Sequence, residues 1–152
     1  MVPIWISAVF LALVTYYVSQ DLPRKESAQA AAVANVSATN MLAYRSAVQA
    51  YLSANPTAAG TVDDAALAAH WLPGYVRRAE WTNLIASGTV FVYSSSVPSN
   101  GTVYALGEKA AQSVLVGTKS TSTGRLQSVY GIETGINLPA AIPTGAVVMM
   151  GR

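Results

Sequence analysis

Few residues of this chain have side chains that could perform catalysis or bind a metal. His70 is the only histidine among the 152 residues, and there is no cysteine. Paired histidine ligands and thiolate metal sites are therefore excluded, and any metal would have to be held by scattered carboxylates. Asp63 and Asp64 are adjacent, so on a helix they point to different sides, and a capping role explains them better than acid/base catalysis. We predict no catalytic, cofactor-binding or metal-binding residues.

Two runs of hydroxyl side chains, at 94–96 and at 120–123, are the other candidates. Neither lies in a G-x-S-x-G or S-x-x-K pattern, in which a serine is activated as a nucleophile, and both runs are typical of turns. Gly117 and Gly124 frame the second run without forming a phosphate-binding glycine pattern. The alternative function that these residues leave open is a membrane-anchored periplasmic hydrolase that uses a serine hydroxyl and His70.

Charge and composition exclude further classes of protein. The net charge is +2, and charged residues make up only 11% of the chain. Nucleic-acid binding usually requires basic residues that are clustered on one face, and here they are scattered. We therefore expect neither a nucleic-acid partner nor a small-molecule substrate. The basic residues are Arg24, Lys25, Arg45, Arg77, Arg78, Lys109, Lys119, Arg125 and Arg152.

The N-terminal stretch is the strongest structural signal. Residues 2–18 contain no charged residue, and a helix of that length rises roughly 25 Å, close to the ~30 Å hydrocarbon core of a bilayer. Trp5, Tyr16 and Tyr17 near its ends are typical of the headgroup region. We predict a transmembrane anchor over residues 1–20. The two alternatives are a cleaved secretory signal, which would need a basic n-region, and a buried helix of a soluble protein, which would carry a polar stripe.

A linker is predicted at 21–26, because Pro23 disfavours helical backbone at the residue before it. Arg24 and Lys25 on this flank favour a cytoplasmic location for the following residues by the positive-inside rule, although acidic neighbours weaken that signal. The weakly charged composition downstream instead suits an exported domain. We predict a single-pass protein of the bacterial inner membrane with its C-terminal domain in the periplasm.

Residues 27–152 are predicted to form an extracytoplasmic α+β domain. Residues 27–53 contain no glycine or proline, and apolar residues recur there at steps of three and four, so an amphipathic helix is expected. A short helix is expected over 63–70, with Thr61 in the N-cap position. An irregular segment at 75–88 precedes β-type sequence, which predicts an antiparallel sheet packed on the long helix. The expected buried face is Val33, Ser37, Met41, Tyr44, Val48, Tyr51 and Leu52, and the expected strands are 89–94, 102–105, 113–119, 125–130 and 145–150.

Several stretches of the chain resemble one known family. They are 72–75, Trp81, Ile85, 88–93, 116–119, 124–126 and 138–148. Together with the order of helices and strands, they resemble the PilM family of conjugative-plasmid thin pili, a type IVb system. The actin-like cytoplasmic protein that shares this name is unrelated. The resemblance covers nearly the whole chain.

The resemblance implies a pilin-like fold and a non-enzymatic role in pilus biogenesis, with pilins and inner-membrane pilus assembly proteins as partners. True prepilins carry a basic leader ending in glycine and a glutamate at the fifth position of the hydrophobic segment. This sequence has neither feature, and its first glutamate is Glu26. The expectation is that prepilin peptidase does not process the chain, and that its role is that of an assembly or accessory protein.

Small side chains at the start of the long helix form the candidate interaction face, which consists of Ser27, Ala28, Ala31 and Ala34. Small residues allow two helices to approach closely. We expect Ala31→Trp or Ala34→Trp to leave the domain folded but to lower pilus-dependent transfer.

Overall fold

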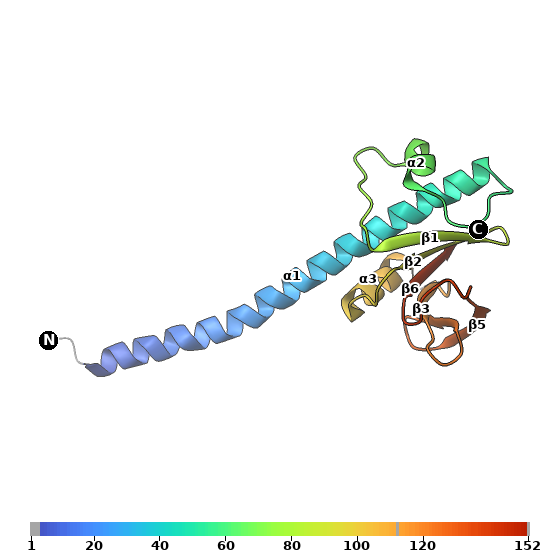
Figure 1. The fold of residues 1–152 in the computed structure, drawn as a ribbon. Coiled ribbons are helices and arrows are strands. Elements are labelled where there is room, and N and C mark those ends of the chain that lie inside the picture. Colours follow the sequence, from blue (N-terminus) through green and yellow to red (C-terminus); the bar gives the residue numbers. More distant parts are fainter. Residues whose placement is uncertain (1–3, 112, 152) are drawn as a thin grey trace. The chain divides into compact units, whose positions relative to one another are not determined.

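The computed structural model describes residues 4–111 and 113–151. The chain divides into an N-terminal unit, Met1–Val33, and a C-terminal unit, Ala34–Arg152. The first contains only helix, and the second contains the end of that helix and all of the sheet. Figure 1 shows the order of these elements along the chain.

The first helix, α1, runs from Ile4 to Ala54 over 51 residues. A linker at 21–26 was therefore the wrong expectation, because this segment is helical in the structure. The preference against helix before Pro23 is local and modest, and the alanine-rich sequence that follows has the highest helix propensity of any composition. In the N-terminal unit, every side chain described between Trp5 and Val33 is exposed.

No helix within the described residues is long and apolar enough to cross a membrane.

In the C-terminal unit, one face of α1 is buried in the main hydrophobic core. Ala34, Ala38, Met41, Tyr44 and Val48 follow one another at steps of three and four residues and are at most 4% exposed. This periodicity confirms the amphipathic helix expected from the sequence. The expected face began too early, because Val33 is 53% exposed.

The sheet has six strands in the order β1-β2-β6-β3-β4-β5, and every neighbouring pair is antiparallel. The fold is therefore α+β, as the sequence predicted. The strands are β1 Trp81–Ala86, β2 Thr89–Ser94, β3 Val116–Lys119, β4 Arg125–Ser128, β5 Glu133–Asn137 and β6 Val147–Gly151.

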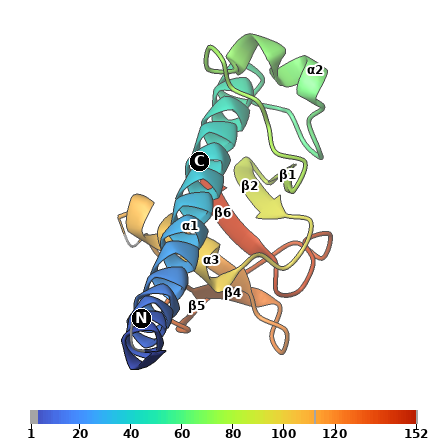
Figure 2. The same cartoon turned by 90° about the vertical axis from the view of Figure 1, so that its left-hand side faces the viewer.

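Both faces of the central strands are buried. In β2, Val90 and Val92 lie in the core shared with α1, whereas Phe91 and Tyr93 lie in a second core on the other face. This alternation follows from the two-residue period of a strand. α3 (Asn100–Lys109) also contributes to the first core through Leu106, so residues 34–54 of α1 and α3 cover the same face of the sheet (Figures 1 and 2).

The loop between β5 and β6 covers the second face of the sheet. Leu138 and Ile142 lie in the second core. The buried Lys119 holds this loop, because its Nζ donates hydrogen bonds to the carbonyls of Pro139 (2.9 Å) and Ile142 (2.7 Å).

Three local expectations were wrong. Residues 102–105 belong to α3 rather than to a strand, because Ser99 caps the helix by accepting a hydrogen bond from Thr102 N (3.3 Å). The segment 75–88 contains the regular strand β1, and the expected loop at 131–144 contains β5. The burial of β1 alternates along the strand, and this pattern depends on its neighbours in the fold.

The short helix expected over 63–70 consists of α2 (Asp64–Leu67) and the 3-10 helix η1 (Ala68–His70). Its N-cap is Asp63 rather than Thr61, and the Asp63 side chain makes no capping hydrogen bond.

The two edges of the sheet are obstructed. At the β1 edge, Gly60 exchanges two backbone hydrogen bonds of 2.8 Å with Ile85. At the β5 edge, the pairing with β4 changes register and the strand bulges. Covered and bulged edges discourage the addition of a further strand. Contact with another protein is therefore more readily made through helix surface than through the sheet.

Candidate functional site

The residues that could have formed a hydrolase site are engaged elsewhere. His70 is half-buried, and its ring lies edge-on to Tyr51 with centroids 5.9 Å apart. Ser94 is buried and accepts a hydrogen bond from Val147 N (3.0 Å). Ser120 lies 3.1 Å from the hydroxyl of Ser122, in the turn before β4. Each of these groups has a structural contact that accounts for its position.

The carboxylates are likewise dispersed or paired. Within the described residues, no group of three or more histidine, aspartate or glutamate side chains could hold a metal ion. Asp64 forms an ion pair with Arg77, with Asp64 Oδ2 3.0 Å from Arg77 Nε.

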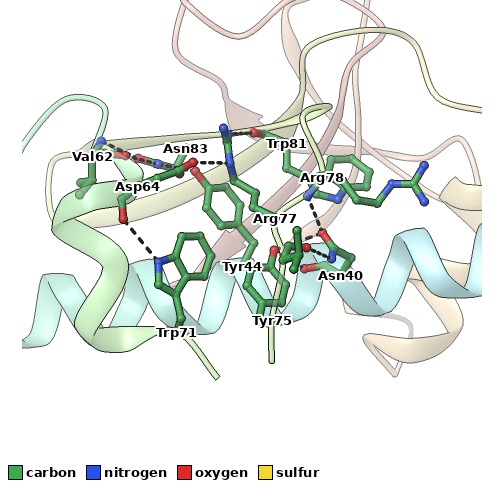
Figure 3. A network of polar contacts seen from close by, with 11 residues as sticks. Asn40, Tyr44, Val62, Asp64, Trp71, Tyr75, Arg77, Arg78, Trp81 and Asn83 are labelled. Carbon is green, nitrogen blue, oxygen red and sulfur yellow. Dashed lines mark hydrogen bonds and ion pairs between the residues drawn. The ribbon is translucent and has the colours of Figure 1, made fainter. Parts of the chain in front are cut away.

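The most elaborate constellation is a cluster that fastens the segment 71–80 to α1 and β1 (Figure 3). We call it the aromatic clamp, and it consists of Asn40, Tyr44, Trp71, Tyr75, Arg77, Arg78 and Asn83. Its aromatic part is a set of nearly parallel rings: Trp71 stacks on Tyr75 with centroids 4.8 Å apart and on Tyr44 at 5.8 Å. Arg77 lies over the ring of Tyr44, 5.7 Å from its centroid. Offset aromatic stacking and cation–π contacts of this kind stabilise the packing of a loop that has no secondary structure of its own.

Asn83 is the buried polar centre of the aromatic clamp. Its Nδ2 donates to Tyr44 OH (2.6 Å) and Val62 O (2.8 Å), and its Oδ1 accepts from Val62 N (2.8 Å). One side chain on β1 thus replaces the backbone pairing that a neighbouring strand would give Val62. A buried amide is stable only when its donors and acceptors are paired, as they are here.

Asn40 has the corresponding role on α1. Its Nδ2 donates to Val76 O (2.8 Å), and its Oδ1 accepts from Arg78 N (3.2 Å) and Tyr75 OH (3.1 Å). These bonds hold the segment 75–78 against the helix.

The two tyrosines of the clamp remain protonated over the physiological range. Burial raises the pKa of Tyr44 above its ordinary value of 10.0, and burial together with the nearby Tyr44 hydroxyl raises the pKa of Tyr75. Neither tyrosine can therefore act as a general base near neutral pH. A small pocket of about 200 Å³ beside Tyr44, Asp63 and Arg77 is lined by groups of this network. The arrangement indicates a structural clamp.

The candidate interaction face divides at the boundary between the two units. Ser27, Ala28 and Ala31 are exposed. Ala34 is only 4% exposed, and its Cβ lies 3.5 Å from the place where a Cβ on Gly101 would stand. We correct the expectation for Ala34: a tryptophan there has no room and would disrupt the core.

Sequence analysis placed Trp71, Tyr75 and Arg77 in an irregular segment and missed the two asparagines that hold them. One signal existed for Asn83, since it stands at a buried position in the alternating strand Trp81–Ala86. A polar residue at such a position requires a hydrogen-bonding partner. Asn40 carried no such signal, because it lies at the margin of the exposed face of α1.

The comparisons with known proteins identify the family. The PilM family model matches residues 9–150. The chain belongs to the PilM family. The resemblance inferred from the sequence is thereby confirmed, and membership indicates a pilus-related role.

Two crystal structures are similar to this PilM-family chain. One, a protein designated PilM from Escherichia coli B7A, is 28% identical, with a TM-score of 0.59 over 81% of this chain and 94% of that one. The other, a protein designated PilM from Pseudomonas aeruginosa 2192, is 33% identical, with a TM-score of 0.44 over 78% of this chain and 95% of that one. The comparison with curated proteins finds no match.

Proposed function

We propose that this PilM-family protein is a non-enzymatic component of the biogenesis of type IVb conjugative thin pili, with an assembly or accessory role. The observation that carries the proposal is the family match across residues 9–150. The described structure adds support of a different kind. Its buried polar network joins segments of the fold to one another, and the side chains with catalytic potential have structural contacts of their own.

The proposed partners are pilins and inner-membrane pilus assembly proteins. Support comes from the exposed, uncharged surface of α1 at Ser27, Ala28 and Ala31. A helix face of small residues permits close approach by a second helix.

We also propose that the apolar N-terminal part of α1 holds the protein at the inner membrane, with the C-terminal unit in the periplasm. Its large side chains are exposed, among them Trp5 (67%), Phe10 (68%) and Leu11 (68%), and residues 2–18 contain no charge. Exposed apolar area of this kind is stabilised by transfer into lipid.

Membrane attachment is tested by fractionating cells that express the full chain. We expect the protein to stay in the pellet after carbonate extraction, with an intact mass that includes the N-terminal residues. A reporter fused after Arg152 should be active in the periplasm. A soluble product that lacks residues 1–20, or a reporter active in the cytoplasm, would contradict the proposal.

The role in pilus biogenesis is tested by deleting the gene from a pilus-producing strain and restoring it in trans. We expect the deletion to remove thin pili in electron micrographs and to reduce mating in liquid far more than mating on a surface. His70→Ala should restore both, because the contact of His70 with Tyr51 is peripheral to the core. Loss of pili in a folded His70→Ala protein would instead favour the hydrolase.

A further inference from the structure

The exposed side of α1 in the C-terminal unit carries an apolar groove. Val36, Thr39 and Ala43 of α1 form its floor, and Tyr75 forms a wall, in a hollow of about 370 Å³. Val36 is 61% exposed, and Val76 beside the wall is 78% exposed. Exposed apolar side chains that gather around a hollow mark a surface that binds another molecule.

The polar atoms around this groove are already bonded within the chain. Thr39 Oγ1 donates to the carbonyl of Asn35 (2.9 Å), so its hydroxyl is satisfied by its own helix. Tyr75 OH donates to Asn40 O (3.1 Å), and Asn40 Nδ2 donates to Val76 O (2.8 Å), which also fixes the wall against α1 (Figure 3). An apolar partner can therefore cover the groove without leaving these groups unpaired.

The same surface continues along α1 with the spacing of a helix–helix seam. Its positions are separated alternately by three and four residues, which is the repeat by which two helices pack side by side. Ser46 and Ser53 donate to carbonyls of their own helix, Leu42 O (3.1 Å) and Gln49 O (2.9 Å), as Thr39 does. The seam consists of Val36, Thr39, Ala43, Ser46, Ala50 and Ser53.

The charge distribution bears on the identity of the occupant. Residues 27–44 contain no charged residue, and none of the seam positions is charged. A partner selected by opposite charge would gain nothing here, whereas a helix with the same uncharged seam meets no repulsion. The seam is also self-complementary, because the protruding Val36 and the small Ala43 occupy equivalent positions one heptad apart. Identical chains usually associate through one surface shared by both copies.

We propose that α1 of a second copy of this chain packs along the seam, so that the protein forms a homodimer through residues 36–53 of α1. The groove beside Tyr75 receives side chains from the second helix at one end of this contact.

The absence of cysteine makes the test direct. The full chain is purified in mild detergent as single-cysteine variants, Val36→Cys and Ala43→Cys, with Thr121→Cys as an exposed control on the turn before β4. After mild oxidation, we expect disulfide-linked dimers several-fold above the Thr121→Cys level. Dimers within each single variant indicate parallel helices, and dimers only in a mixture of Val36→Cys with Ala43→Cys indicate antiparallel helices.

A charge placed in the seam provides a second measurement. Val36→Glu should retain the helical circular dichroism of the parent protein, because this side chain is largely exposed, while sedimentation shifts from dimer to monomer. The proposal is overturned if seam cysteines crosslink no more than Thr121→Cys, or if the unmodified chain sediments as a monomer at the same concentration. It is also overturned if seam cysteines in pilus-producing cells crosslink only to a different protein.

Discussion

Replacement of Asn83 by leucine is expected to lower the free energy of unfolding by about 3 kcal/mol. Leucine has a similar size but no polar atoms, so Tyr44 OH and both backbone groups of Val62 would lose their partner in a buried environment. Each unpaired buried group costs about 1–3 kcal/mol, reduced where water can enter. Urea unfolding of the full chain, followed by tryptophan fluorescence, measures the change.

Thr82→Val is the matched control for Asn83→Leu. Thr82 is the neighbouring residue on β1 and is half-buried, and valine keeps its β-branched shape. The control should stay within about 0.5 kcal/mol of the parent protein. If Asn83→Leu were as stable as Thr82→Val, the aromatic clamp would not be the device that holds the segment 71–80.

Replacement of Gly117 by alanine is expected to be comparably damaging. A Cβ at Gly117 would overlap the backbone carbonyl of Gln127 on the neighbouring strand and would lie 3.0 Å from Ser128 Cα. Main-chain atoms in a sheet cannot move aside as a flexible side chain can, so β3 and β4 would have to separate. We expect a loss of about 3 kcal/mol, at the upper end for overpacking, measured as a lower midpoint of thermal unfolding.

Gly101→Ala distinguishes this steric effect from a general effect of replacing glycine. A Cβ at Gly101 would meet Ala34 Cβ at 3.5 Å, which is an ordinary contact. In the first turn of α3, alanine should be neutral or stabilise by up to about 1 kcal/mol. Equal stability of the Gly117→Ala and Gly101→Ala proteins would show that β3 and β4 are less closely paired than described here.

The sequence predicted the elements whose stability depends on local pattern. The face of α1 from Ala34 to Val48 was readable because its apolar residues keep helical spacing over several turns. β2 and β6 were readable because they are continuous apolar runs, as is usual for strands buried on both faces. In both cases the pattern in the sequence is the physical cause of the structure.

The errors have equally specific causes. Residues 102–105 are rich in strand-forming side chains, and the cap by Ser99 together with the packing of Leu106 outweighs that preference. The turn preference of Pro23 was outweighed by the helix propensity around it. The aromatic clamp joins Asn40 and Tyr44 to residues more than thirty positions later in the chain. Contacts at that separation depend on the fold and leave no periodic trace in the sequence.

The central claim, that this protein acts through contact with other pilus components, is tested most directly by photo-crosslinking from α1 in living cells. A crosslinking amino acid at Ala28, which is exposed in the N-terminal unit, is introduced into cells that express the pilus operon, and the adducts are identified by mass spectrometry. The same residue at Thr121 is the control. We predict adducts from Ala28 with pilins or inner-membrane pilus assembly proteins that are absent from the control. The account would be contradicted by a lack of such adducts from Ala28 in cells that make normal pili, together with normal transfer when Ala31 is replaced by tryptophan.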